Sequence, residues 1–288
     1  MLNSLRTQTL KPDEIIIVLK RSGDESESVI KNYNDLPINV IVQNEGRIVQ
    51  AYDIGIRSAN GDLLLFIDDD AIAEPSWVEK YVNFFNSVEE VGGASGNVYI
   101  TEIDESGNQK VKYEYSNFPD TRNVFWRKPL KGLENFCEGI SISGFNYKYK
   151  CNEKLKYYKS TALIGVNMAI KKESISGLSL SSLFKNSHIG FHFENFLAYY
   201  VITKGYFTYK IINKEISPTV FHIENLSTTR SKGWKFEFWK HYDIVKQFHR
   251  LKKINANVSW TAYTMACIAT LRRHPIPRLL ATVYAQFV

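Results

Sequence analysis

Short apolar runs alternate with segments of helical spacing along the first hundred residues. Each run is continuous and rich in Ile, Val and Leu, as is typical of strands buried on both faces. Strands are therefore expected at 15–19, 38–42, 63–67 and 93–99, and helices at 26–33, 46–59 and 75–85. This order predicts an α/β fold with a mostly parallel central sheet flanked by helices.

The pattern changes after residue 100. Residues 101–160 are polar, rich in Tyr and Lys and weakly periodic, which indicates an insertion over one edge of the sheet. Strand character returns at 161–171 and 206–212, with a helix between them at 193–204. We divide the chain into a domain at 1–229 that contains this insertion and a helical segment at 230–288, which opens with an amphipathic pattern.

The positive charge of the chain is concentrated in its last part. The net charge is +6, but residues 230–288 carry eleven Lys and Arg against two acids. Such a segment favours a polyanionic partner. Zinc-finger spacing and RNA-binding aromatic motifs are missing from the sequence, so we expect no nucleic-acid partner and favour an anionic membrane surface. A solvated basic face is the alternative interpretation.

Cysteine usage and hydropathy bear on the compartment. Cys137, Cys151 and Cys267 are scattered and lack CxxC spacing, so we expect free thiols in a reducing cytosol and no metal at these residues. The N-terminus has no apolar signal-peptide core, and the run from Ala256 to Leu271 is too short and polar to span a bilayer. The expected location is cytoplasmic and peripheral, at the inner face of the cell membrane.

Three carboxylates, Asp68, Asp69 and Asp70, directly follow the apolar run at 63–67. They lie at the carboxyl end of a strand, where open α/β sheets bind ligands. Crowded negative charges need compensation, and hard divalent ions bind to one or two carboxylates together with substrate phosphates. The cluster predicts a cation and phosphate site, with an exposed acidic turn as the alternative.

The stretch from Asn44 to Val82 resembles the family 2 glycosyltransferases of the GT-A fold. In that family a helix of the type G-x-x-x-A-R-N-x-G-I-x-x-A leads through a Gly-Asp pair into a strand that ends in an Asp-x-Asp signature. The matching residues here are Gly46, Ala51, Gly55, Ile56, Ala59, Gly61, Asp62, Asp68 to Asp70, Pro75 and Trp77. The segment from Leu5 to Leu19 is similar to the helix and strand that precede this motif. The resemblance covers roughly residues 1–250.

The resemblance implies a nucleoside-diphosphate sugar as donor and a divalent cation, Mg²⁺ or Mn²⁺, as cofactor. Asp68 and Asp70 would face the diphosphate through the metal, with Asp70 as a direct ligand, and Asp69 would contact the ribose or the sugar. Gly46 and Asp53 are assigned to the nucleotide-sugar site as well.

Three further segments match the family downstream. The first is TALIGVNMAIKKE, in which Gly165 would allow close approach of a substrate and Asn167 would offer an amide to sugar hydroxyls. A buried strand with an incidental Asn is the alternative. In the second, GFHFENFLAYYVITKGY, Glu194 occupies the place of the carboxylate that accepts the proton of the acceptor hydroxyl. His222 in PTVFHIE matches a position that completes the metal site or touches the diphosphate.

The sequence also departs from the family pattern. Phe193 replaces an acid, and Tyr200 stands where the family has Arg. The family opens with a strand of the type P-x-Y-N that holds the nucleotide base, and this sequence begins at the helix that follows that strand, so we expect either a truncated start or an absent first strand. Leu19 and Lys20 occupy the place of a base-contacting Asp. Arg21 or Asp24 would then have to substitute for that Asp.

We therefore expect an inverting, metal-dependent glycosyltransferase that modifies a glycan or lipid-linked acceptor. Residues 101–160 would form the acceptor side. A nucleotidyltransferase and a non-catalytic, membrane-associated subunit of the same fold are the alternatives.

Overall fold

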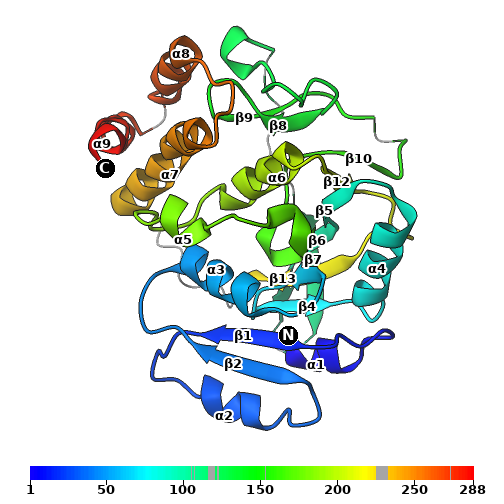
Figure 1. Ribbon diagram of the computed structural model, residues 1–288. Coiled ribbons are helices and arrows are strands. Elements are labelled where there is room, and N and C mark those ends of the chain that lie inside the picture. The colour runs from blue at the N-terminus through cyan, green and yellow to red at the C-terminus, as the bar shows by residue number, and fades with distance from the viewer. Residues whose placement is uncertain are drawn as a thin grey trace.

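A two-stranded parallel layer forms one end of the molecule (Figure 1). Strands β1 (Ile15–Leu19) and β2 (Ile38–Val42) pair in parallel, and α2 (Ser26–Lys31) connects them. The short helix α1 (Leu2–Arg6) precedes β1 and packs against the strand that follows the aspartate cluster. The structure is a computed structural model. It describes residues 1–104, 106, 108–115, 121, 123–152, 154–224, 233–272 and 274–288.

The central sheet has five strands in the order β10-β12-β5-β11-β3. Their bounds are β3 (Leu63–Phe66), β5 (Val91–Ser95), β10 (Tyr157–Lys159), β11 (Met168–Lys171) and β12 (Phe207–Ile211). Only β12 and β5 pair in parallel, and the other neighbours are antiparallel. The expected mostly parallel sheet is therefore wrong, and the sheet is mixed. The reversal arises because β11 enters from the insertion and not from a β-α-β crossover.

A second sheet holds β4 (Ala71–Ala73), β6 (Asn97–Ile103), β7 (Gln109–Glu114) and β13 (Thr219–Ile223) in the order β4-β13-β6-β7. Strand β13 runs parallel to β6 and antiparallel to β4. This pairing brings the segment just after the aspartates beside residues about 150 positions later in the chain, as the register of His222 opposite Ala71 shows.

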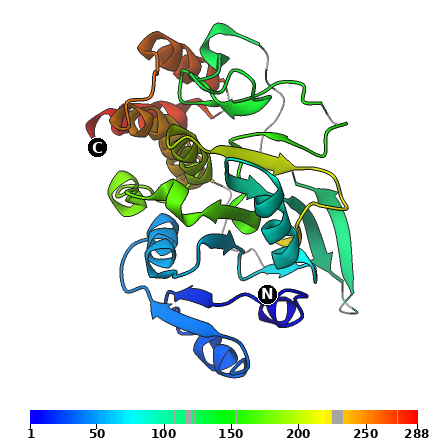
Figure 2. The ribbon, with the colours of Figure 1, turned by 45° about the vertical axis from the view of Figure 1, so that its right-hand side comes forward.

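Helices cover both faces of the central sheet (Figures 1 and 2). Helices α3 (Ile48–Ser58) and α6 (Phe193–Thr203) contribute to one apolar core, with the short α5 (Leu180–Leu183) beside them. Helix α4 (Trp77–Ser87) packs into the other core with Tyr81 and Phe84. The expected helices at 26–33, 46–59, 75–85 and 193–204 are thus confirmed within a few residues.

The sheet system is interrupted between β1 and β3. Among the described strands β1 pairs only with β2, and β3 pairs only with β11. Glu14, just before β1, links the two layers, because its carboxylate accepts hydrogen bonds from the backbone N–H groups of Asn60 and Gly61, just before β3.

The segment 101–160 contributes β7, the 3-10 turn η1 (Phe125–Arg127), β10 and a hairpin of β8 (Glu138–Ile140) and β9 (Asn146–Lys148). The hairpin brings Cys137 and Cys151 to a Cα separation of 5.2 Å, and the two residues form a disulfide. The expectation of three free thiols was wrong, because strand pairing and not sequence spacing brings these residues together. Cys267 is free and buried.

Three helices close the chain: α7 (Trp234–Lys253), α8 (Trp260–Thr270) and α9 (Pro275–Phe287). They share a core with Tyr242, Phe248 and Tyr263 and lie at the end of the molecule opposite the β1–β2 layer (Figures 1 and 2). Within the described residues, none of the helices has the length and hydropathy needed to cross a bilayer.

Candidate functional site

Two aspartates and a histidine form a cluster at the ends of three strands. The ligand atoms of Asp68, Asp70 and His222 all lie within 4.8 Å of one another. His222 Nε2 lies 3.0 Å from Asp70 Oδ1 and 4.0 Å from Asp68 Oδ2. The backbone fixes this arrangement, because the N–H of Ile223 donates to the carbonyl of Asp70 at 2.9 Å.

The local fold explains why the carboxylates converge. The chain leaves β3 after Phe66 and turns into β4, and the N–H of Ala71 closes the turn onto the carbonyl of Asp68. Asp68 and Asp70 are therefore on the same side, whereas the intervening Asp69 is exposed. Two carboxylates and an imidazole within 4.8 Å provide oxygen and nitrogen donors that suit Mn²⁺ better than the all-oxygen preference of Mg²⁺.

Glu194 approaches the same region from the first turn of α6. An added Cβ on Gly165 would lie 2.8 Å from Glu194 Oε1 and 3.0 Å from the hydroxyl of Tyr52. The Tyr52 hydroxyl donates to the carbonyl of Gly165 at 3.3 Å. Gly165 thus permits a close approach of Glu194 and Tyr52, and its expected role toward a substrate stays a prediction.

Tyr52 lies near both Asp68 and Glu194. Burial raises the pKa of its phenol well above the ordinary value, and the negative charges of Asp68 and Glu194 raise this pKa further. The ring packs on Phe66 at 5.4 Å and on Phe193 at 4.6 Å between centroids. Phe193, a departure from the family pattern, is thus a buried packing residue.

Sequence reasoning did not identify Tyr52. The signal was available, since Tyr52 follows Ala51 at the position where the family pattern has Arg. Tyr200, the other departure, lies on α6 and donates to the carbonyl of Ser176. It therefore ties α6 to the segment after β11.

Asn167 is a fully buried structural brace. Its Oδ1 accepts hydrogen bonds from Trp77 Nε1 at 2.8 Å and from the Tyr81 hydroxyl at 2.7 Å. Its Nδ2 donates to the carbonyls of Asn97 at 2.8 Å and Pro218 at 2.9 Å. These four bonds use the two donors and both acceptor positions of the amide, so the amide has no bond left for a sugar hydroxyl.

Asp53 is also engaged within the protein. Its Oδ1 accepts from the backbone N–H of Leu180, and its Oδ2 lies 3.0 Å from Arg57 Nε. The carboxylate is buried and joins α3 to α5. The structure does not bring it to the aspartate cluster.

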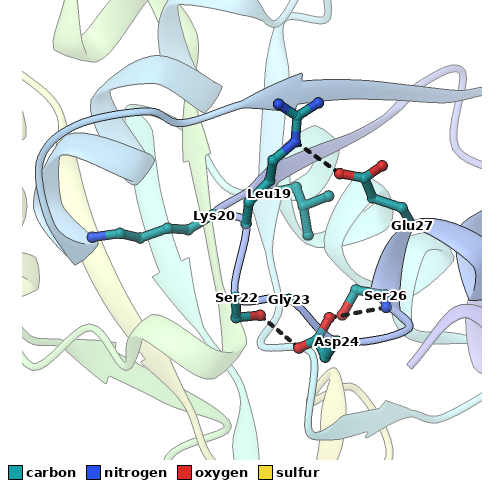
Figure 3. A pocket seen from close by; sticks show the side chains of 8 residues that line it. Leu19, Lys20, Ser22, Gly23, Asp24, Ser26 and Glu27 are labelled. Atoms are coloured by element: carbon teal, nitrogen blue, oxygen red, sulfur yellow. Dashed lines mark hydrogen bonds and ion pairs between the residues drawn. The ribbon is translucent and has the colours of Figure 1, made fainter.

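A shallow hollow lies beside the loop after β1 (Figure 3). Arg21 pairs with Glu27 at 2.9 Å. Asp24 accepts from the Ser22 hydroxyl at 2.6 Å, and its bonds to Ser22 and Ser26 lower its pKa to about 2. Both substitutes that we considered for the missing base-contacting Asp are thus bonded within their own loop.

Gly46 lies between β2 and α3, two residues before α3 begins. Its φ of 91° favours glycine, and its carbonyl accepts from Lys20 Nζ at 3.0 Å. In Figure 3 the Lys20 side chain extends away from the other labelled residues of the hollow. Gly46 therefore shapes the turn between β2 and α3, and its role toward a nucleotide stays a prediction.

Comparisons with known proteins identify relatives among glycosyltransferases. In sequence, the chain is 40% identical over 164 residues to the uncharacterized glycosyltransferase YwdF of Bacillus subtilis, covering 55% of each chain. It is 30% identical over 97 residues to a glucosyl-dolichyl phosphate glucuronosyltransferase of Haloferax volcanii, covering 33% of this chain and 31% of that protein. The chain thus spans about half or less of the length of these relatives.

In structure, the chain is similar to GalNAc-T7, whose crystal structure contains UDP, GalNAc and Mn²⁺. The TM-score is 0.54 at 14% identity, and the match covers 96% of this chain and 55% of that one. This likeness shows the GT-A fold. The family model "Glycosyl transferase family 2" matches residues 1–217. The chain therefore belongs to glycosyl transferase family 2.

Proposed function

We propose that the protein transfers a sugar from a nucleoside-diphosphate sugar to an acceptor hydroxyl. The observation that carries this proposal is the convergence of Asp68, Asp70 and His222 within 4.8 Å, with Tyr52 near both Asp68 and Glu194. Membership in glycosyl transferase family 2 supports the reaction class. UDP, GalNAc and Mn²⁺ in the GalNAc-T7 structure illustrate the ligands that this fold holds.

Asp68, Asp70 and His222 would hold a divalent cation, and their mixed oxygen and nitrogen donors fit Mn²⁺ better than Mg²⁺. When bound, such a cation neutralises charge that develops on the leaving diphosphate. Asp69 is exposed beside this cluster and is available to a ribose or sugar hydroxyl.

Glu194 is proposed as the general base. Its carboxylate would take the proton of the acceptor hydroxyl while the acceptor oxygen attacks the anomeric carbon and the diphosphate leaves from the opposite face. Such a single displacement inverts the configuration. Gly165 would leave room for this carboxylate, because an added Cβ there would lie 2.8 Å from Glu194 Oε1 and 3.0 Å from the Tyr52 hydroxyl.

We further propose a glycan or lipid-linked acceptor and action at a membrane surface. One relative is named for a glucosyl-dolichyl phosphate substrate, which is a lipid-linked glycan. The bond between Cys137 and Cys151 removes the cysteine argument for a reducing cytosol. The proposal therefore concerns the membrane surface, and the cytoplasmic side stays a prediction.

The test is a transfer and hydrolysis assay with Mn²⁺ and UDP-, GDP- and dTDP-sugars. We expect Glu194→Gln to lower turnover by about 10²- to 10⁴-fold while nucleotide binding persists. Asp70→Asn should lower turnover and also weaken nucleotide binding, by about tenfold or more. Glu89→Gln, an exposed change of the same chemistry, is the matched control.

Two results would contradict the proposal. Full activity of Glu194→Gln would exclude it as the base. A well-folded wild-type chain that neither turns over any donor nor binds a nucleotide with Mn²⁺ would favour the non-catalytic subunit.

A further inference from the structure

Helix α9 packs on the protein through small residues and presents large apolar residues outward. Pro277, Ala281 and Ala285 are buried, the two alanines within the core that α7 shares. On the opposite side Ile276 is 65% exposed and Phe287 is 83% exposed, and Leu279, Leu280 and Val283 are exposed as well. A surface helix of a globular protein normally has the reverse arrangement, with its apolar stripe toward the core.

Helix α8 also presents large apolar side chains to the solvent. Trp260, Met265 and Ile268 are exposed, and α8 contains no charged residue. The one charged residue of α9, Arg278, is half-buried and bound to Glu237 at 3.2 Å. We define the α8–α9 face by six exposed side chains: Trp260, Ile268, Ile276, Leu279, Val283 and Phe287. Large apolar side chains exposed on two helices that contact each other are typical of an interaction site.

Basic groups border this face. Lys252 Nζ lies 4.9 Å from the centre of the Trp260 ring, and Arg272 and His274 are exposed in the turn between α8 and α9. Lys246 Nζ donates to the carbonyl of Ala285 at the end of α9.

Both acids of the described residues 233–288 are neutralised by arginines. Glu237 pairs with Arg278, and the buried Asp243 pairs with Arg250 at 3.1 Å. The remaining charged side chains of the described residues 233–288 are Lys and Arg, which makes this part of the surface attractive to anions.

We propose that the α8–α9 face docks on an anionic lipid surface, with both helices lying in the plane of the membrane. An apolar face bordered by cations fits the boundary between acyl chains and anionic headgroups. Docking of this kind needs no membrane-spanning helix, and no described helix is long and apolar enough to cross a bilayer. A second copy of the chain is a poorer occupant, because a two-fold contact would bring two positive rims together.

The test is sedimentation of the full chain with sucrose-loaded vesicles of phosphatidylcholine, with and without phosphatidylglycerol. We expect binding to the anionic vesicles to exceed binding to neutral ones by about tenfold or more, with loss at high salt. The double variant Leu279→Asp/Val283→Asp should bind at least about tenfold more weakly. Both residues are exposed, so its melting temperature should match that of the wild type. Val111→Asp, at an apolar residue of β7 that is 50% exposed, is the control and should bind like the wild type.

Three outcomes would overturn the inference: no vesicle binding by the wild type, undiminished binding by the double variant, or a concentration-dependent dimer that the double variant abolishes. Vesicle binding needs no sugar donor, so failure here is distinguishable from failure of the transferase proposal. Hydrolysis of a soluble donor should be equal in the wild type and the double variant.

Discussion

Replacement of Asn167 by Ala separates a structural role from a substrate-binding role. In the wild type the buried amide joins α4, through Trp77 and Tyr81, to the backbone at Asn97 and Pro218. The carbonyl of Pro218 keeps a second donor, the N–H of Asn97, at 3.0 Å. The variant therefore leaves three buried groups without this partner: the Trp77 N–H, the Tyr81 O–H and the Asn97 carbonyl.

Each buried group that loses its partner costs about 1–3 kcal/mol, so the lower estimate for Asn167→Ala is about 3 kcal/mol of unfolding free energy. At roughly 2–4 °C per kcal/mol for a domain of this size, the melting temperature should fall by roughly 6–12 °C. Thermal and urea unfolding of the full chain measure both quantities. Asn257→Ala, at an exposed loop residue, is the control and should unfold like the wild type. An unchanged melting temperature together with a raised KM for the donor would refute the structural role and restore Asn167 as a sugar ligand.

Three further predictions concern stability and cysteine chemistry. Asp243→Ala should lower the unfolding free energy by about 3–5 kcal/mol, because it leaves the Arg250 guanidinium buried without its partner; a loss under about 1 kcal/mol in urea titration would contradict this. Thiol titration of the unreduced chain in denaturant should count one thiol, since Cys137 and Cys151 are bonded, and a count of three would contradict the disulfide. Burial lowers the pKa of His192, His241 and His249 to about 4. As the pH falls from about 6.5 to about 4, these histidines take up protons in the unfolded chain before they do so in the folded chain, so the unfolding free energy should decrease over that range. An unfolding free energy that does not change with pH there would argue against their burial.

Local patterns sufficed for the elements that lie near one another in the sequence. The apolar runs at 15–19, 38–42 and 63–67 predicted β1, β2 and β3. Strand direction was not predictable in this way, because β11 reaches its place between β5 and β3 through the insertion. Direction depends on chain reversals in a polar, weakly periodic segment that local propensity does not describe.

In the candidate site, too, local sequence patterns identified some residues, whereas contacts between distant segments could not be predicted. Asp68 and Asp70 were identified from their place after an apolar strand. His222 came only from the family resemblance, and its contact with Asp70 depends on the long-range pairing of β4 with β13. The hydrogen bonds of Asn167 were not predictable, because the partners of its Oδ1 are 86 and 90 residues away in the sequence.

The C-terminal helices illustrate a third limit. The basic composition of 230–288 predicted an anionic surface as partner. The sequence did not show which side of α9 faces the protein, because its small residues and its large apolar residues both recur at helical spacing. Packing of Ala281 and Ala285 into the shared core decides this and leaves the large residues exposed.

The most direct test of the account is calorimetric titration of UDP and GDP into the full chain with and without Mn²⁺. The central claim is that Asp68, Asp70 and His222 hold the cation that in turn holds the diphosphate. We predict that the wild type binds one of these nucleotides only with Mn²⁺, that Asp70→Asn weakens binding by about tenfold or more, and that Asp62→Asn, at an exposed aspartate just before β3, binds like the wild type. Nucleotide binding that needs no metal, or that survives intact in Asp70→Asn, would contradict the claim.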